Sequence, residues 1–516
     1  MRAKRFLSIC LLLLATIGTL YASDNKRSVE VKIQSGEKWW GLAVDPAGMH
    51  LPFEGSFVIN TAEFSPTLYK ANMLLSTRGR YLWSEKPISV SFDGKKLIVT
   101  PAEGESIKIE KSGRSLRESY LMCCHKHFPP QEVGASATLF ERPIYEFGGD
   151  KALLYTQQDV LDFAAMLDKR GAPSGTILLP IGWNSTSGKM VFDAEVYPDP
   201  KGMIEELHKK GMKVMLTVTP YVMAAGRGYQ YYRGNNGLLE GADGAPLVFP
   251  SRLGYTACRA LSPEEIASMR EELLLLQKDF GVDGFYFDSL DAIDILSEDS
   301  ARTEEFIGAW QEASQGFDVA IYSSPVAQQL GSIASSVSPS RNYSWATLGE
   351  SLERAIDASV LGFSRTSLAA DLNFEDENPK LILRTASLAA VLPVAIIPYS
   401  VWSLEDTTPL CKILQWRAEN GAYILSLAQQ GATTAEPIIR HLEYQFPRTG
   451  FANCTDEFMI GSKWLVAPVV SGNDVRMVRL PKGKWKDYYN GRTFKGPRVI
   501  DVDVSEGKLP LFEKID

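Results

Sequence analysis

The chain has 516 residues, of which 45% are hydrophobic and 22% charged, and its formal net charge is −8. This composition is typical of a globular protein, and the length predicts about two to four domains. The acidic balance argues against nucleic acid as the main partner, because binding to phosphates needs a basic surface. A neutral small molecule or a polysaccharide is compatible with it.

Residues 1–22 have the pattern of an export signal. The cationic start MRAKR precedes an uncharged apolar run from Phe6 to Leu20, and the small residues Ala22 and Ser23 follow. These are the three regions of a secretory signal peptide. The alternative, an uncleaved anchor, fits less well because a membrane span needs about 20 apolar residues. We therefore expect a secreted or periplasmic protein with no membrane span in its mature chain.

Residues 23–135 predict an antiparallel β-sandwich. Polar and apolar residues alternate along short segments, and turn signals such as Asp93-Gly94 separate them. The strand-like segments are 29–33, 88–92, 97–100 and 107–109. The run CCHKH at the end of this region contains four potential metal ligands. Its spacing is not that of a zinc site and no second ligand pair is evident, so the sequence predicts no metal and no cofactor.

Residues 136–440 predict a (β/α)₈ TIM barrel. Strand-like and helical segments alternate here, which favours a parallel sheet, and the length suits a closed eight-stranded barrel. The strand-like segments are 176–179, 213–218, 284–287, 319–322 and 393–397, and the helical ones are 201–210 and 263–280. A doubly wound open sheet is the alternative, but no glycine-rich phosphate loop follows the first strand.

Residues 441–516 predict a small C-terminal β-domain. Segments 464–470 and 476–480 are strand-like, and the run PKGKW at 481–485 predicts a turn between strands.

Asp288 is the first candidate for chemistry. It follows the apolar strand 284–287, and active sites of such barrels lie at the C-terminal ends of the strands. An N-cap for the next turn is the alternative role, because Asp is a favoured capping residue.

Several motifs resemble glycoside hydrolase family 31. They are GVDGFYFD at 281–288, FDAEVYPDPKGMI at 192–204, EPIIR at 436–440, DEFMIGS at 456–462 and LPKGKW at 480–485. The resemblance implies a retaining α-glycosidase in which Asp288 is the nucleophile. In that mechanism a second carboxyl group, about 5 Å away, protonates the leaving oxygen and later activates water.

The expected second carboxyl group is the main departure from the family. The resemblance places it in the loop after the sixth strand, where this chain has Ser340 or Leu348 according to the alignment anchor. Glu350 is the acidic residue of that loop and the candidate substitute. Its alternative role is to begin the next helix, where the helix dipole favours a negative charge.

The resemblance also indicates candidate sugar-binding residues. Trp183, at the end of the second strand, is placed either to stack on a sugar ring or to fill the core. Asp291 stands where the family often has a Glu, and Arg341 where it has an Arg that contacts substrate. Asp371 either matches the family's substrate-binding Asp or is a plain loop residue.

Three functions follow from these observations. The first is an exported glycosidase that cleaves α-glycosidic bonds of oligosaccharides or glycans with retention. The second is a non-catalytic carbohydrate-binding protein of the same fold, since fold alone does not fix function. The third, a barrel enzyme of another class, would need a metal or cofactor signature. The sequence leaves the sugar, the linkage and the oligomeric state open.

Overall fold

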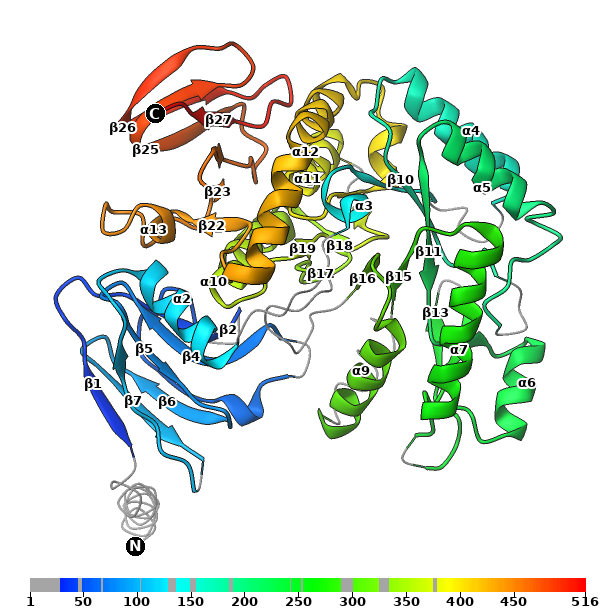
Figure 1. Cartoon of the computed structure of the whole chain (residues 1–516), viewed down its shortest axis with the longest axis horizontal. Coiled ribbons are helices and arrows are strands. Elements are labelled where there is room, and N and C mark those ends of the chain that lie inside the picture. The colour runs from blue at the N-terminus through cyan, green and yellow to red at the C-terminus, as the bar shows by residue number, and fades with distance from the viewer. Residues whose placement is uncertain are drawn as a thin grey trace, which may run out of the picture. The chain divides into compact units, whose positions relative to one another are not determined.

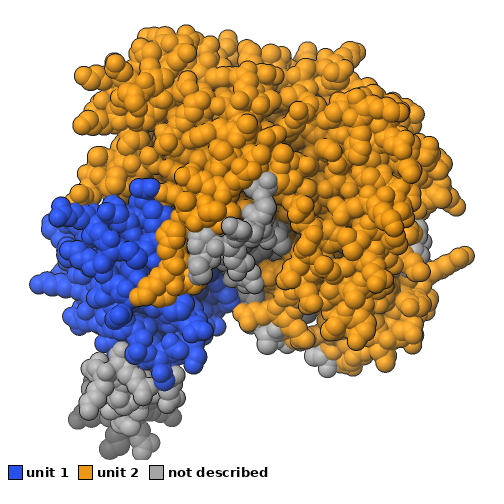
Figure 2. All heavy atoms as spheres, viewed as in Figure 1, with its two compact units in different colours: residues 1–64, 70–123 blue, residues 65–69, 124–516 orange. Residues whose placement is uncertain are grey.

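The computed structural model describes residues 28–44, 49–65, 68–102, 104–128, 136–148, 155–184, 189–241, 243–251, 254–288, 300–323, 334–374 and 378–516. These fall into two compact units (Figures 1 and 2). The first unit comprises residues 1–64 and 70–123, and the second comprises residues 65–69 and 124–516. The predicted signal segment lies outside the described residues.

The first unit contains two four-stranded antiparallel sheets, which confirms the predicted sandwich. One sheet has the order β1 (Val29–Lys32), β7 (Lys96–Pro101), β6 (Ile88–Phe92) and β3 (Phe57–Asn60). The other has the order β2 (Trp39–Ala43), β4 (Lys70–Ser76), β5 (Arg80–Trp83) and β8 (Glu110–Lys111). Alternate residues of β6 and β7 are buried, as their sequence pattern predicts. The segment 107–109 is not a strand, since the chain joins its sheet only at β8.

A short 3₁₀ turn and one helix complete this part of the chain. They are η1 (Thr61–Glu63) and α2 (Leu116–His127). Cys123, in α2, is fully buried and its thiol lies 3.9 Å from the sulfur of Met73. The adjacent Cys124 is 1% exposed. Both thiols therefore belong to packed interiors.

The second unit confirms the predicted barrel. Within the described residues, eight strands form one parallel sheet in chain order. They are β9 (Ile144–Glu146), β10 (Thr176–Leu179), β11 (Lys213–Val218), β15 (Gly284–Phe287), β16 (Ala320–Tyr322), β17 (Ala334–Ser336), β19 (Thr366–Ser367) and β21 (Ile396–Ile397). The first strand pairs with the eighth. On the remaining side, the backbone N–H of Val394, just before β21, donates to Thr366 O in β19 at 3.0 Å.

Helices surround these strands (Figure 1). They are α3 (Ala137–Phe140), α4 (Gln157–Lys169), α5 (Pro200–Lys209), α7 (Pro263–Leu275), α9 (Ser300–Ser314), α10 (Trp345–Val360), α11 (Pro379–Val391) and α12 (Thr408–Thr434). The local sequence determines where several of these helices begin. Thr156 forms a capping box with Asp159 at the start of α4, and Asp199 and Ser262 cap α5 and α7, which begin with proline. A π-helical turn, η2 (Leu276–Phe280), prolongs α7 to the end of the predicted helix. Among the described helices, α12 included, none is both long enough and apolar enough to cross a bilayer.

An insertion follows the third barrel strand. It contains a three-stranded antiparallel sheet and one helix. These are β12 (Tyr221–Met223), α6 (Arg227–Gly234), β13 (Val248–Ser251) and β14 (Gly254–Cys258). Val222, Tyr232, Leu238 and Ala257 form its small hydrophobic cluster. Further along the barrel, η3 (Tyr399–Ser403) follows β21, and β18 (Asn342–Tyr343) pairs with β20 (Asn373–Phe374).

The C-terminal domain is one antiparallel sheet with a short helix, α13 (Leu442–Gln445). Its strands, in sheet order, are β22 (Ile439–His441), β23 (Phe458–Ile460), β24 (Trp464–Val466), β27 (Leu511–Lys514), β25 (Val475–Asp487) and β26 (Thr493–Asp503). The predicted turn at 481–485 is wrong, because β25 runs through it with a shift of register between Leu480 and Gly483. The opposing Gly496 makes room for this bulge: a Cβ there would lie 1.8 Å from Pro481 O.

Buried Arg417 joins α12 to the rest of the barrel. Its guanidinium donates to Leu392 O at 2.5 Å, to Phe140 O at 2.8 Å, and to the carbonyls of Ala390 and Pro393 at 3.4 and 2.6 Å. Three of these carbonyls belong to the end of α11 and the segment after it, and the fourth ends α3. Carbonyls at a helix end have no partner within the helix, so one cation satisfies several of them.

Arg417→Met is expected to lower the free energy of unfolding by about 3–5 kcal/mol, because four buried carbonyls lose their donor. The measurement is the midpoint of urea unfolding, followed by tryptophan fluorescence. Gln429→Met, at an exposed position of the same helix, is the control and should unfold like the parent. Equal midpoints for both variants would contradict this role of Arg417.

Candidate active site

Asp288 lies at the C-terminal end of the fourth barrel strand, as predicted. Its backbone N–H donates to Val218 O of the third strand at 2.9 Å, which continues the ladder between β11 and β15. Phe285 and Phe287 are fully buried, and the ring of Phe287 lies 5.4 Å from that of Trp310. This aromatic packing fixes the strand, so the carboxyl group of Asp288, a residue 9% exposed, is held at the mouth of the barrel.

Arg341 contacts Asp288 directly. Its Nη2 donates to Oδ2 of Asp288 at 2.5 Å, and both side chains are mostly buried. Arg341 lies in the segment between the sixth strand, β17, and α10. Its carbonyl accepts a hydrogen bond from the backbone of Asn373 at 2.8 Å, next to the pairing of β18 with β20. The structure therefore brings together two residues that the sequence analysis singled out separately.

Tyr286 links Asp288 to the loop after the seventh strand. Its hydroxyl accepts a hydrogen bond from the backbone N–H of Ala370 at 3.1 Å. Burial first, and then the negative charges of Asp288 and Glu146, raise the pKa of Tyr286 far above its usual value. The hydroxyl is thus neutral and acts as a fixed hydrogen-bonding group beside Asp288.

Glu146 is a functional candidate that the sequence analysis missed. It ends the first barrel strand and is 7% exposed. Its Oε1 accepts from the backbone N–H of Asp371 at 2.5 Å, and its Oε2 accepts from that of Tyr399 at 3.3 Å. The only signal in the sequence was an acidic residue directly after the apolar pair Ile144-Tyr145. A carboxylate at a strand end is expected to need partners, but the sequence does not show which.

Asp371 has a left-handed backbone, with a φ of 66°. This conformation is uncommon for a residue with a Cβ and persists where surrounding contacts fix it. The hydrogen bond to Glu146 is one such contact. Asp371 follows Ala370, which contacts Tyr286. This position is compatible with substrate binding, one of the two roles left open for Asp371.

Trp183 is packed in the interior. It is 1% exposed, its indole N–H donates to Thr217 O at 2.7 Å, and its ring lies 5.1 Å from that of Phe192. A sugar-stacking residue needs an accessible ring face, so these contacts favour the core role. The sugar-binding assignment of Trp183 is corrected accordingly.

Glu350 lies in the second turn of α10 and is exposed. The helix begins at Trp345, where the side chain of Ser344 caps it by accepting from the backbone of Thr347. Leu348, one of the two positions at which the family's acid was expected, is buried in the same helix. The alternative role, that Glu350 begins this helix, is wrong, because α10 begins five residues earlier and has no acidic residue in its first turn. Asp291 lies outside the described residues.

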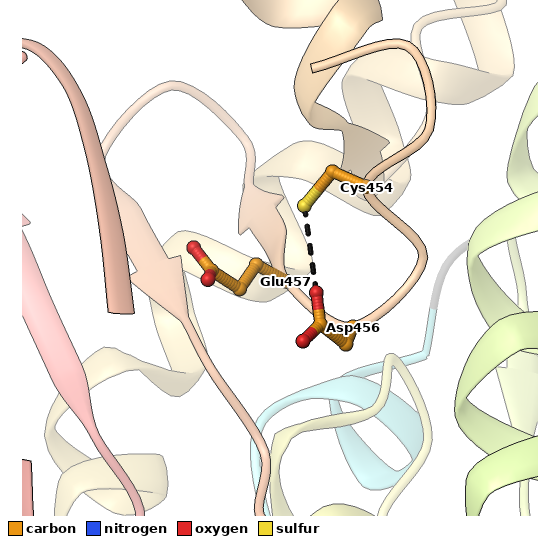
Figure 3. Close-up of side chains that lie close together, drawn as sticks. All are labelled: Cys454, Asp456 and Glu457. Atoms are coloured by element: carbon orange, nitrogen blue, oxygen red, sulfur yellow. Dashed lines mark hydrogen bonds between the residues drawn. The ribbon is translucent and has the colours of Figure 1, made fainter. Parts of the chain in front are cut away.

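A cluster of potential metal ligands lies in the C-terminal domain (Figure 3). The thiol of Cys454 lies 3.6 Å from Oδ1 of Asp456, and the fully buried Glu457 follows in the chain. Arg476 lies 2.8 Å from Asp456, and Arg479 pairs with both Asp456 and Glu457. Since two guanidinium groups already balance the two carboxylates, the cluster is an ion-pair network that ties β25 to the start of β23.

Comparisons with known proteins extend this picture. Residues 143–315 match the TIM-barrel domain of the glycosyl hydrolases of family 31, and residues 435–515 match the C-terminal domain of the same family. The chain belongs to glycoside hydrolase family 31. The first of these matches contains Glu146 and Asp288, and it confirms the resemblance that the motifs suggested.

Two curated relatives are distant from this chain in sequence. An α-glucosidase of Saccharolobus solfataricus is 23% identical over 72% of this chain and 62% of its own length. An α-xylosidase of the same organism is 22% identical over 94% of this chain and 70% of its own length. The chain thus spans less than two thirds of the α-glucosidase.

Solved structures share the fold at low identity. A family 31 α-xylosidase from a soil metagenome, in complex with xylose, covers 94% of this chain and 79% of its own, with a TM-score of 0.72 and 17% identity. A family 31 sulfoquinovosidase from E. rectale covers 95% of this chain and 82% of its own, with a TM-score of 0.74 and 17% identity.

Glu146→Ala is expected to destabilise the barrel by about 2–4 kcal/mol, since two buried backbone N–H groups lose their acceptor. Glu146→Gln, which keeps one acceptor oxygen, should recover part of the loss. Chemical unfolding of the three proteins gives the comparison. If Glu146→Ala is as stable as the parent, Glu146 does not support the loop at Asp371.

Proposed function

We propose that the protein is an exported, retaining glycosidase that cleaves α-glycosidic bonds of oligosaccharides or glycans by double displacement. The observation that carries the proposal is the pairing of Asp288 with Arg341 at the C-terminal end of the fourth barrel strand. Membership of family 31 and distant similarity to an α-glucosidase and an α-xylosidase support it.

In the first step Asp288 acts as the nucleophile. One carboxylate oxygen bonds to the anomeric carbon while the bond from that carbon to the leaving oxygen breaks, which gives a glycosyl ester of the enzyme. Arg341 holds Oδ2 of Asp288 and so orients the attacking group. In the second step water attacks the same carbon, the ester bond breaks and the attacking water gives up one proton to solvent, so the carboxylate is restored with net retention.

Within the part of the chain that the structure describes, no residue is evidently placed to transfer a proton to the leaving oxygen. The loop positions 340–349 contain no carboxylate, and Glu350 is exposed on α10. Glu146 is poorly arranged to donate a proton, because both of its oxygens accept N–H hydrogen bonds. The substrates that fit this site best have leaving groups that depart without protonation.

The same observation favours a second candidate function, binding of a carbohydrate without turnover. Loss of the acid removes a contribution of about 10²- to 10⁴-fold to the rate but does not by itself abolish binding of a sugar. Turnover of activated substrates distinguishes the two functions.

Asp288→Asn is expected to reduce hydrolysis of aryl α-glucosides and aryl α-xylosides to the level of buffer alone, because an amide cannot form the ester. Asp279→Asn, at an exposed acid just before β15, should retain the parental rate. A fluorinated α-glycosyl fluoride that slows the second step should leave a covalent adduct on the peptide with Asp288, seen by mass spectrometry. No turnover by the parent, together with saturable sugar binding, would support the non-catalytic function.

Aryl glycosides with different leaving groups test whether the protein supplies a catalytic acid. We expect rates that rise steeply with the acidity of the phenol released, both in the parent and in Glu350→Gln. Glu312→Gln, at an exposed position of α9, is the control. A loss of about 10²-fold or more, confined to Glu350→Gln and to poor leaving groups, would instead identify Glu350 as the acid.

Export follows from the first 22 residues. The full-length chain, expressed in a bacterium with a general secretion pathway, should reach the periplasm or medium with a mass that shows cleavage near Ala22. Uncleaved chain that stays with the cells would contradict export.

A further inference from the structure

A cavity of about 530 Å³ lies in the second unit, away from the residues around Asp288. It is bounded by α11, by the start of α12, and by the turn between β26 and β27. That turn packs closely on the helices: a Cβ added to Gly507, which has a φ of 72°, would lie 2.5 Å from Leu383 and 3.1 Å from Pro409. The cavity therefore lies where the barrel helices meet the C-terminal domain.

Cationic side chains predominate in its lining. Lys380, Arg384, Lys412 and Lys508 face it, against the two acids Asp406 and Glu506. The acids are already engaged. Asp406 accepts from the backbone N–H of Thr408 at 2.8 Å, and Glu506 pairs with Lys508 at 2.9 Å. Lys380 pairs with Asp474 at 2.7 Å.

Arg384 is the buried cation of this group. It is 5% exposed, its Nη2 donates to Asn473 O at 2.6 Å, and its guanidinium carbon lies 5.7 Å from the ring centre of Trp345. Its Nη1 is also buried, and no residue in the described part of the chain accepts a hydrogen bond from it. A buried, charged donor without an acceptor is costly, and an anion is the partner that best compensates for it.

The size of the cavity indicates what the anion belongs to. Its volume lies within the range of small-molecule sites, about 300–1,000 Å³, and exceeds what one inorganic oxyanion fills. We propose that this cavity binds a sugar-sized organic anion, whose carboxylate or phosphate group is held by Nη1 of Arg384. Lys412, exposed at the rim, adds a second positive charge. This site is separate from the glycosidase site and does not depend on catalysis there.

Calorimetric titration of the full-length mature chain tests the proposal with glucuronate, glucose 6-phosphate, glucose and inorganic phosphate at constant ionic strength. We expect saturable binding of the two sugar anions that inorganic phosphate does not match, and no binding of glucose at this site. Thermal unfolding should shift upward with the same ligands, because a ligand that binds only the folded state stabilises it. Glucose binding that Arg384→Met weakens as much as it weakens glucuronate binding, or inorganic phosphate binding as well as glucose 6-phosphate, would overturn the assignment.

Variants locate the site. Arg384→Met should weaken binding of the sugar anions by about tenfold or more, through loss of a charge-assisted hydrogen bond. Lys412→Glu, at an exposed position that leaves the fold intact, should weaken it as well. Lys486→Met, an exposed lysine of β25 outside the cavity, should bind like the parent. Unchanged affinity in Lys412→Glu and in folded Arg384→Met would overturn the proposal.

Discussion

A buried cation, Arg417, supports the closure of the barrel. The last strand of a parallel barrel must return beside the first, and here α12 follows that last strand and packs against α3, which precedes the first. Arg417 satisfies carbonyls of both neighbours of α12. One turn later, Gly421 allows the helix to approach so closely that a Cβ would lie 2.1 Å from Glu141 O. Arg417 and Gly421, four residues apart on one face of α12, thus hold this helix against the junction between the first and last barrel strands, which we call the seam.

The seam in turn determines the mouth of the barrel. Because β21 pairs with β9, the N–H of Tyr399 comes within reach of Glu146. The other oxygen of Glu146 holds the N–H of Asp371, and the preceding N–H, that of Ala370, reaches Tyr286. Tyr286 stands two residues before Asp288 on one strand. Hydrogen bonds between backbone and side chain therefore connect the seam to Tyr286, two residues before the proposed nucleophile.

The sequence predicted the parts of this arrangement that depend on local pattern. Alternation of strands and helices indicated the barrel, and the end of an apolar strand indicated Asp288. Glu146 and Tyr286 escaped because their partners lie 225 and 84 residues away. A long-range hydrogen bond to a backbone N–H leaves no trace in residue type. The prediction of a turn at 481–485 was wrong for a related reason. The proline and glycine of this segment suggest a turn, but they form a bulge, which Gly496 on the opposite strand accommodates. Trp183 could be assigned to the core only once Thr217 was seen to accept from its indole.

The hydrogen bonds and charges at the mouth of the barrel bear on which residue could act as the catalytic acid. A retaining site needs one carboxyl group that stays ionised and one that carries a proton, and different environments keep the two apart. Here Asp288 has a guanidinium within hydrogen-bonding distance, and Glu146 is held by two N–H donors. In this arrangement Oδ2 of Asp288 and both oxygens of Glu146 act as hydrogen-bond acceptors. Burial raises the pKa of the Tyr286 hydroxyl far above its usual value, so this group loses its proton too reluctantly to replace that acid. Among the described residues, this arrangement therefore suits the proposed nucleophile, Asp288, better than it suits a proton donor.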